Sequence, residues 1–69
     1  MKRLRIFLND GREFEEKNVI EYNYLKDKGY VCIKQSIKDK KFDRPIEYLS
    51  EYNDVARVQE ILHNRKVVG

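Results

Sequence analysis

The sequence predicts a small α+β domain that is mainly β: a twisted antiparallel sheet of four to five strands, built from two hairpins, followed by a helix. Two observations predict the sheet. Apolar residues alternate with polar ones in several segments, and residues typical of turns separate these segments. A third observation, apolar residues at helical spacing after residue 54, predicts the helix. We treat residues 1–69 as a single domain, because a chain of 69 residues has room for one small core.

The first hairpin is predicted from a strand over residues 2–8, in which apolar and polar side chains alternate. A three-residue turn that ends at Gly11 leads to a second strand over residues 12–16. A loop of this length pairs Ile6 with Phe14 and keeps the apolar face on one side, whereas a two-residue loop would divide it. It also places Gly11 in the left-handed conformation after a type I turn, which glycine adopts at little cost.

The second hairpin joins a strand over residues 19–25 to a strand over residues 30–35 through a four-residue turn. This loop length places the apolar side chains of both strands on one face of the hairpin. It also sets Glu21 opposite Lys34 on the other face, where the two side chains can form an ion pair. Two independent features therefore predict the same register.

The segment that follows is polar, so we expect a loop or a bent sheet edge over residues 36–44. Pro45 has no N–H group to donate to a neighbouring strand. A short fifth strand over residues 46–49 would therefore begin at Pro45 or lie at an edge of the sheet.

The helix is predicted over residues 55–66, with Asp54 as its N-cap. Apolar side chains follow helical spacing at Val55, Val58, Ile61 and Leu62. The alternative is a final strand over residues 55–61 that follows one turn of 3₁₀ helix over residues 50–54. The sequence favours the helix because good helix formers fill the positions between the apolar ones.

Two stretches of the chain carry a resemblance to a known family. Lys2–Phe14 contains a strand, an Asp-Gly turn and a returning strand, and Pro45–Leu62 contains Pro-Ile-Glu-Tyr-Leu-Ser followed by Val-x-x-Val-x-x-Ile-Leu. This pattern resembles small SH3-like or Sm-like β proteins of Gram-positive bacteria and their phages. The resemblance implies an all-β SH3-like barrel, whose last segment would be a strand, and a product of a phage or mobile element. It carries over no functional residue.

Several function classes lack the residues they need. Cys32 and His63 are the only cysteine and the only histidine, so a zinc site of cysteines or a histidine cluster cannot form. The three glycines match no phosphate-binding loop, and no serine has a base at a recognisable spacing. We therefore expect no enzyme, no cofactor and no small-molecule substrate. A single unpaired cysteine, and a first segment without the apolar run of a signal peptide, suggest a cytoplasmic protein that does not enter membranes.

Tyrosine is the unusual component, with five residues in the chain and no tryptophan. We assign Tyr22 and Tyr24 to the apolar face of the second hairpin. The other three are candidates for a protein-binding surface: Tyr30, Tyr48 and Tyr52. Tyrosine offers a large contact area and a hydroxyl group at low entropic cost. The favoured function is a non-enzymatic protein-binding module, which self-associates or regulates or inhibits a host protein.

The alternative function is nucleic-acid binding. The net charge is +3, and residues 18–44 carry most of the excess. The residues proposed for this role are Lys34, Lys38, Lys40, Lys41 and Arg44, together with the aromatic Phe42. Basic side chains beside an aromatic ring suit single-stranded nucleic acid. Asp39 and Asp43 lie in the same segment and weaken the positive charge, so this function ranks second.

Overall fold

Five antiparallel strands make up the structure, a computed structural model that describes residues 1–61. The strands are β1 (Lys2–Leu8), β2 (Glu13–Leu25), β3 (Tyr30–Asp39), β4 (Arg44–Tyr52) and β5 (Val55–Ile61), and one 3₁₀ turn, η1 (Lys26–Lys28), joins β2 to β3. They form one sheet in the order β4-β3-β2-β1-β5. The mainly-β prediction is therefore confirmed, and residues 1–61 contain no α-helix.

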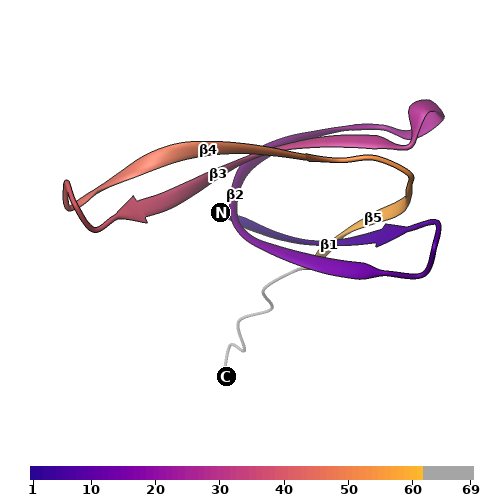
Figure 1. Cartoon of the computed structure of the whole chain (residues 1–69), viewed down its shortest axis with the longest axis horizontal. Helices are drawn as coiled ribbons and strands as arrows, with labels where there is room; N and C mark the ends of the chain where they lie inside the picture. Colours follow the sequence, from indigo (N-terminus) through magenta and orange to yellow (C-terminus); the bar gives the residue numbers. More distant parts are fainter. Residues whose placement is uncertain (62–69) are drawn as a thin grey trace, which may run out of the picture.

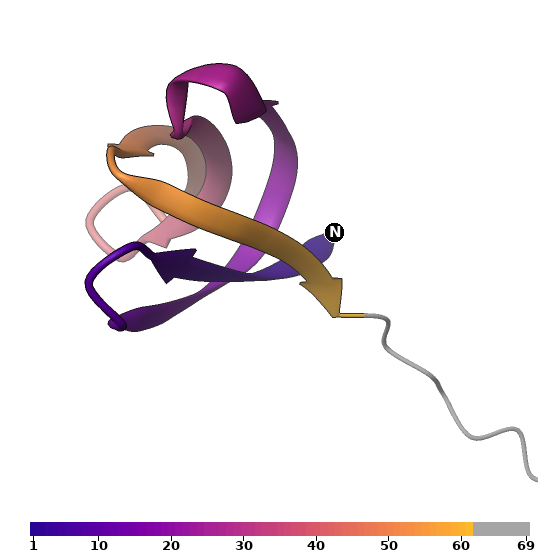
Figure 2. The ribbon, with the colours of Figure 1, turned by 90° about the vertical axis from the view of Figure 1, so that its right-hand side faces the viewer.

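The sheet curls around its own core. In Figure 1 the long strand β2 runs from the β3–β4 side of the molecule to the β1–β5 side, and Figure 2 shows the resulting curvature from the side. The buried apolar side chains come from β1, β2, β3 and β5; they are Leu4, Ile6, Leu8, Val19, Val31, Ile33 and Val55. One layer of sheet can enclose this core because the strands bend toward their own apolar face.

The predicted register of the first hairpin is confirmed. Ile6 lies opposite Phe14, and the N–H of Leu8 donates to the Arg12 carbonyl at 2.9 Å across a three-residue turn. Gly11 has a φ of 96°, in the left-handed region, and its N–H donates to the Leu8 carbonyl at 3.1 Å. The apolar face of β1 thus stays whole, as the sequence pattern requires.

The predicted register of the second hairpin is also confirmed. Leu25 lies opposite Tyr30 and Glu21 lies opposite Lys34, with 3.3 Å between the Lys34 Nζ and a Glu21 carboxylate oxygen. Gly29 closes η1 with a φ of 60°, and a Cβ atom added there would lie 3.3 Å from the Val55 carbonyl oxygen. Both the conformation and the close neighbour favour glycine at this position.

The two strands predicted over residues 12–16 and 19–25 are one continuous strand, β2. Asn18 lies inside it with a φ of 55°, and the pairing register shifts beside it, between Val19 and Glu21. Asparagine tolerates the left-handed conformation better than most side chains. The segment between the two predicted strands is therefore a sharp bend within one strand. Because of this bend, β2 pairs with β1 in its first half and with β3 in its second half.

Of the two alternatives for residues 36–44, the loop is wrong for most of its length, because strands at the edge of the sheet hold most of these residues. β3 continues to Asp39 and β4 begins at Arg44, so only residues 40–43 form the turn. Ile37 lies opposite Ile46 and Lys38 lies opposite Pro45. The polar composition concealed an extended hairpin, because its side chains are exposed and do not alternate with buried ones. β4 is an edge strand, which confirms the position expected for Pro45.

The helix predicted over residues 55–66 is wrong for residues 55–61, which form β5; residues 62–66 lie outside the described part. Leu8 pairs with Val55 but Phe7 pairs with Arg57, so the register shifts by one residue at Ala56. Such a bulge places side chains three residues apart on the same face. Val55 and Val58 therefore both face the core, and their spacing imitates a helix. The 3₁₀ turn considered for residues 50–54 is absent too, since β4 extends to Tyr52.

The curled core predicts a large difference between two substitutions that each remove part of an aliphatic side chain. Ile6 is 0% exposed and Leu49 is 64% exposed. We expect Ile6→Ala to lower the free energy of unfolding by about 2–5 kcal/mol, enough to unfold much of so small a protein. Leu49→Ala should change it by less than about 0.5 kcal/mol. Urea unfolding followed by circular dichroism measures both, and equal losses would contradict the assignment of the core.

Candidate functional site

The outer half of the β3–β4 hairpin extends beyond the core as an arm. In Figure 1 it ends at the 40–43 turn, at the far end of the molecule from η1. The pairing of β2 with β3 stops at Val19 and Gln35, whereas β3 and β4 pair on to Asp39 and Arg44. Beyond Gln35, β3 therefore has β4 as its neighbour on one side and no strand on the other among the described residues.

Apolar side chains lie on one face of this arm. Directly opposite residues of antiparallel strands share a face, so the face that holds Ile33 in the core continues through Gln35 to Ile37 on β3. On β4 the same face carries Tyr48 and Ile46. We call Ile37, Ile46 and Tyr48 the arm face; their exposed fractions are 41%, 43% and 52%. They occupy positions on the same face as the core residues, but they lie at or beyond Gln35, where the pairing of β2 with β3 ends.

The tip and the opposite side of the arm carry further exposed residues. Phe42, in the turn, is 61% exposed. The Lys41 Nζ and the Arg44 guanidinium carbon each lie 5.9 Å from the centre of the Phe42 ring, close enough for weak cation–π attraction. Leu49 is exposed on the other face, opposite Lys34. The arm thus has an apolar face and a basic tip.

The three tyrosines proposed for binding do not lie together. Tyr48 belongs to the arm face and is well exposed. Tyr30 is half-buried at the start of β3, and partial removal from water, followed by the nearby Glu51 carboxylate, raises the pKa of its hydroxyl group. Tyr52 is half-buried and packs against the core. Of the three, only Tyr48 offers most of its ring to a partner.

Tyr52 has a structural role. Its ring lies 5.3 Å from the Phe14 ring, centre to centre, and its hydroxyl donates to the Glu16 carboxylate. Glu16 also accepts a hydrogen bond of 2.9 Å from the buried side chain of Gln35. Burial, and then the Glu16 carboxylate, raise the pKa of Tyr52 to about 12. These contacts join β2, β3 and β4 where the core ends and the arm begins.

Ion pairs occupy part of the basic cluster proposed for nucleic acid. Lys34 lies 3.3 Å from Glu21 and 3.8 Å from Glu47, and these carboxylates, Glu21 above all, raise its pKa. Lys38 lies 3.6 Å from Asp43. Lys40, Lys41 and Arg44 have no ion pair within residues 1–61. Carboxylates therefore offset the charges of Lys34 and Lys38, and the rest of the positive charge of the cluster lies at the tip of the arm.

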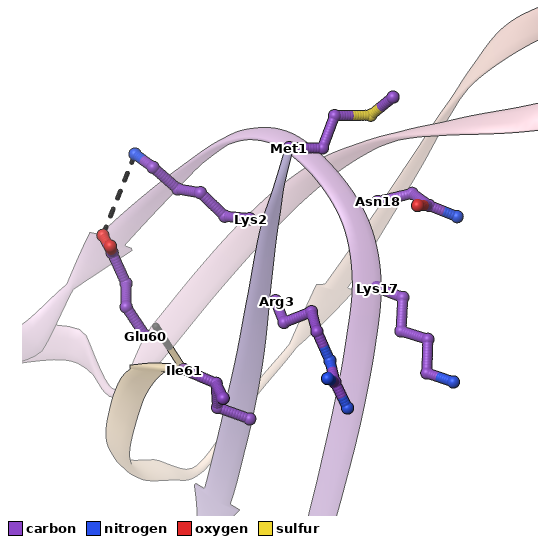
Figure 3. A pocket seen from close by; sticks show the side chains of 7 residues that line it. All are labelled: Met1, Lys2, Arg3, Lys17, Asn18, Glu60 and Ile61. Carbon is purple, nitrogen blue, oxygen red and sulfur yellow. Dashed lines mark ion pairs between the residues drawn. The ribbon is translucent and has the colours of Figure 1, made fainter. Parts of the chain in front are cut away.

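A hollow of about 510 Å³ lies beside the start of β1, the bend of β2 and the end of β5, and was not anticipated from the sequence. Figure 3 shows its lining: Met1, Lys2, Arg3, Lys17, Asn18, Glu60 and Ile61. Two of its cations already have partners, because Lys2 lies 3.8 Å from Glu60 and Arg3 pairs with Glu15. The bend at Asn18 forms one wall, which a sequence pattern predicting two separate strands could not reveal.

The described part of the chain holds no group of three or more histidine, cysteine or acidic residues placed to bind a metal ion. Cys32 is a half-buried free thiol in the middle of β3. His63 lies outside the described residues. In residues 1–61 no helix has the length and apolar character needed to cross a membrane.

Comparison of the chain with protein-family models, with curated proteins and with solved structures finds no significant match.

The position of Tyr52 predicts how stability changes in alkaline solution. Its pKa in the folded state, about 12, lies above the ordinary value of 10.0, so the protonated hydroxyl stabilises the fold. This contribution is complete below pH 10 and is lost as the pH rises through 12. We expect Tyr52→Phe to be less stable than the parent near pH 7, by about 1 kcal/mol for the lost hydrogen bond.

The difference in unfolding free energy between parent and Tyr52→Phe should shrink between pH 10 and pH 12. Urea unfolding at several pH values in this range measures it. A difference that stays constant across the range would show that the hydroxyl of Tyr52 is not held by Glu16.

Proposed function

We propose that this protein is a non-enzymatic protein-binding module that contacts its partner through the arm face. The proposal depends on the exposure of Ile37, Ile46 and Tyr48 to solvent. These side chains share the face that forms the core, yet each is more than 40% exposed. Adjacent apolar side chains on the surface of a small protein often mark an interaction site.

The chemistry of the arm face supports a protein partner. Tyrosine is enriched among the residues that contribute most to protein–protein binding, because it buries a large ring and keeps a hydroxyl for hydrogen bonding. Ile37 and Ile46 lie opposite each other beside Tyr48 and supply the aliphatic surroundings that exclude water. A partner that covers the arm face would remove these exposed apolar side chains from water, and this burial would contribute hydrophobic free energy to binding.

The fold type, the origin and the cellular role of the protein are proposed from its resemblance to small SH3-like or Sm-like β proteins. The all-β strand content and a first strand that pairs with both the second and the last support an SH3-like arrangement. On that basis we propose a protein from a phage or mobile element that regulates or inhibits a host protein. Its single unpaired cysteine supports a cytoplasmic location.

Nucleic-acid binding is the second candidate, and Phe42 is the observation that favours it. Its exposed ring lies near Lys41 and Arg44 at the tip of the arm, an arrangement suited to stacking on a base beside a phosphate. It ranks second because Glu21, Glu47 and Asp43 pair with the two lysines of β3. The remaining positive charge of the cluster lies in the 40–43 turn and at Arg44, the first residue of β4.

A photo-cross-linking experiment tests the proposed function. Tyr48→p-benzoylphenylalanine places a reactive aromatic group on the arm face, and Asn23→p-benzoylphenylalanine, on an exposed position of β2, is the control. Irradiation in the producing cells should give a protein adduct from position 48 that is absent from position 23. Mass spectrometry identifies the cross-linked protein, and adducts between two copies of this chain are recognised by their mass.

The partner identified in this way should then be purified and titrated with the parent protein and with Tyr48→Ala. We expect Tyr48→Ala to weaken binding at least about tenfold, the loss typical of a central aromatic contact. Equal affinity for both proteins would reject the arm face as the binding site. Binding of a labelled single-stranded oligonucleotide that weakens steeply with salt and is abolished by Phe42→Ala would support the second candidate instead.

A further inference from the structure

Within residues 1–61, no strand pairs with the outer edge of β4. β4 is the last strand at one end of the sheet order, and its neighbour is β3 alone. The ladder between them is regular from Val31–Tyr52 to Asp39–Arg44. An open strand edge presents unpaired N–H and C=O groups on which another strand can form hydrogen bonds.

Pro45 shows which residues of β4 point their backbone groups outward. In an antiparallel ladder, hydrogen-bonded pairs alternate with non-hydrogen-bonded pairs. Pro45 lies opposite Lys38 and has no N–H, so this pair is a non-hydrogen-bonded one. Every second residue after it, namely Glu47, Leu49 and Glu51, then turns its N–H and C=O toward the open edge.

The charges of β4 exclude two of the ways in which this edge could pair with itself. An antiparallel pairing centred on Glu47 would set Glu47 opposite Glu47 of the second copy. A pairing centred on Leu49 would set Glu47 opposite Glu51 of the second copy. Both place like charges side by side, which is destabilising. Pairings centred on Ile46, Tyr48 or Ser50 oppose no like charges, and of these only the one centred on Tyr48 engages all nine residues of β4. It sets Glu47 opposite Leu49 and Pro45 opposite Glu51.

The same register joins the two arm faces. Residues directly opposite share a face, so Tyr48 meets Tyr48 of the second copy and Ile46 meets Ser50. The Tyr48 pair would be a non-hydrogen-bonded one, the closer of the two kinds, with about 4.5 Å between Cα atoms. The apolar side chains of both arms would then form one continuous strip across the joined sheets.

We propose that two copies of this chain pair antiparallel along β4, with the Tyr48 residues on the twofold axis. The inference rests on the proposed function, since it names a second copy as an occupant of the arm. It goes further in specifying the edge, the register and the symmetry of the contact.

Two substitutions at Leu49 test the contact by analytical ultracentrifugation. Leu49→Pro removes an outward N–H, and the proline already present at position 45 shows that the β3–β4 ladder accepts proline at an outward position. Leu49→Ala keeps the N–H and shortens the same exposed side chain. We expect the parent and Leu49→Ala to sediment as dimers, and Leu49→Pro to dimerise at least tenfold more weakly while its circular dichroism spectrum stays that of the parent.

A second measurement reads the register without relying on a folded proline variant. In a Cys32→Ser background, Tyr48→Cys should form a disulfide between two copies under mild oxidation, because the paired Cα atoms lie within disulfide range. Ile46→Cys should not, since Ser50 of the second copy lies opposite it.

Each result bears on the inference. A monomeric parent, or dimers that cross-link as readily through Ile46→Cys as through Tyr48→Cys, would overturn it. In that case a cross-link from position 48 to a different protein would still support the proposed function. Loss of every position-48 cross-link would reject the proposed function as well.

Discussion

The pairing of β1 with strands on both of its sides is the constraint on which the rest of the structure depends. Ile6 lies opposite Phe14 of β2 on one side and opposite Val58 of β5 on the other. Leu4 and Ile6 are 0% exposed as a result. To bring β5 back to β1, the sheet has to curl, and the curl is what gives a chain this small an enclosed core. The arm is the part of the sheet that this curl does not reach.

The local hairpins could be predicted from the sequence because two requirements agreed in each of them. For the second hairpin, a shared apolar face and the Glu21–Lys34 pair specify the same register, and for the first, Gly11 and the apolar face do so. A strand over residues 55–61 was only the alternative to a helix, since the bulge at Ala56 gives β5 the apolar spacing of a helix. The continuity of β2 was hidden as well, because Asn18 is typical of a turn and here makes a bend.

The candidate site was predicted only in part, for a physical reason. Residue type identified Tyr48 as a possible contact, but exposure depends on where neighbouring strands stop. Tyr52 and Tyr48 lie on the same face of β4, four residues apart, yet Tyr52 packs on Phe14 and Tyr48 faces solvent. Tyr52 lies opposite Val31, within the β2–β3 pairing, whereas Tyr48 lies opposite Gln35, where that pairing ends. Ion pairing of Lys34 with Glu47 likewise needs the β3–β4 ladder, which the polar sequence did not predict.

The short turn between β4 and β5 has a consequence for the order in which the chain folds. The N–H of Val55 donates to the Gly29 carbonyl, and the N–H of Asn9 donates to the Asp54 carbonyl. The turn between β4 and β5 is therefore hydrogen-bonded to the turns of both earlier hairpins. During synthesis both hairpins can form soon after they emerge, because their contacts are local. β1 must nevertheless wait with one side unpaired until β5 is made, and closing so long a loop is slow. Until β5 is made, the apolar side chains of β1 therefore stay incompletely buried, the condition in which nascent chains are prone to aggregate.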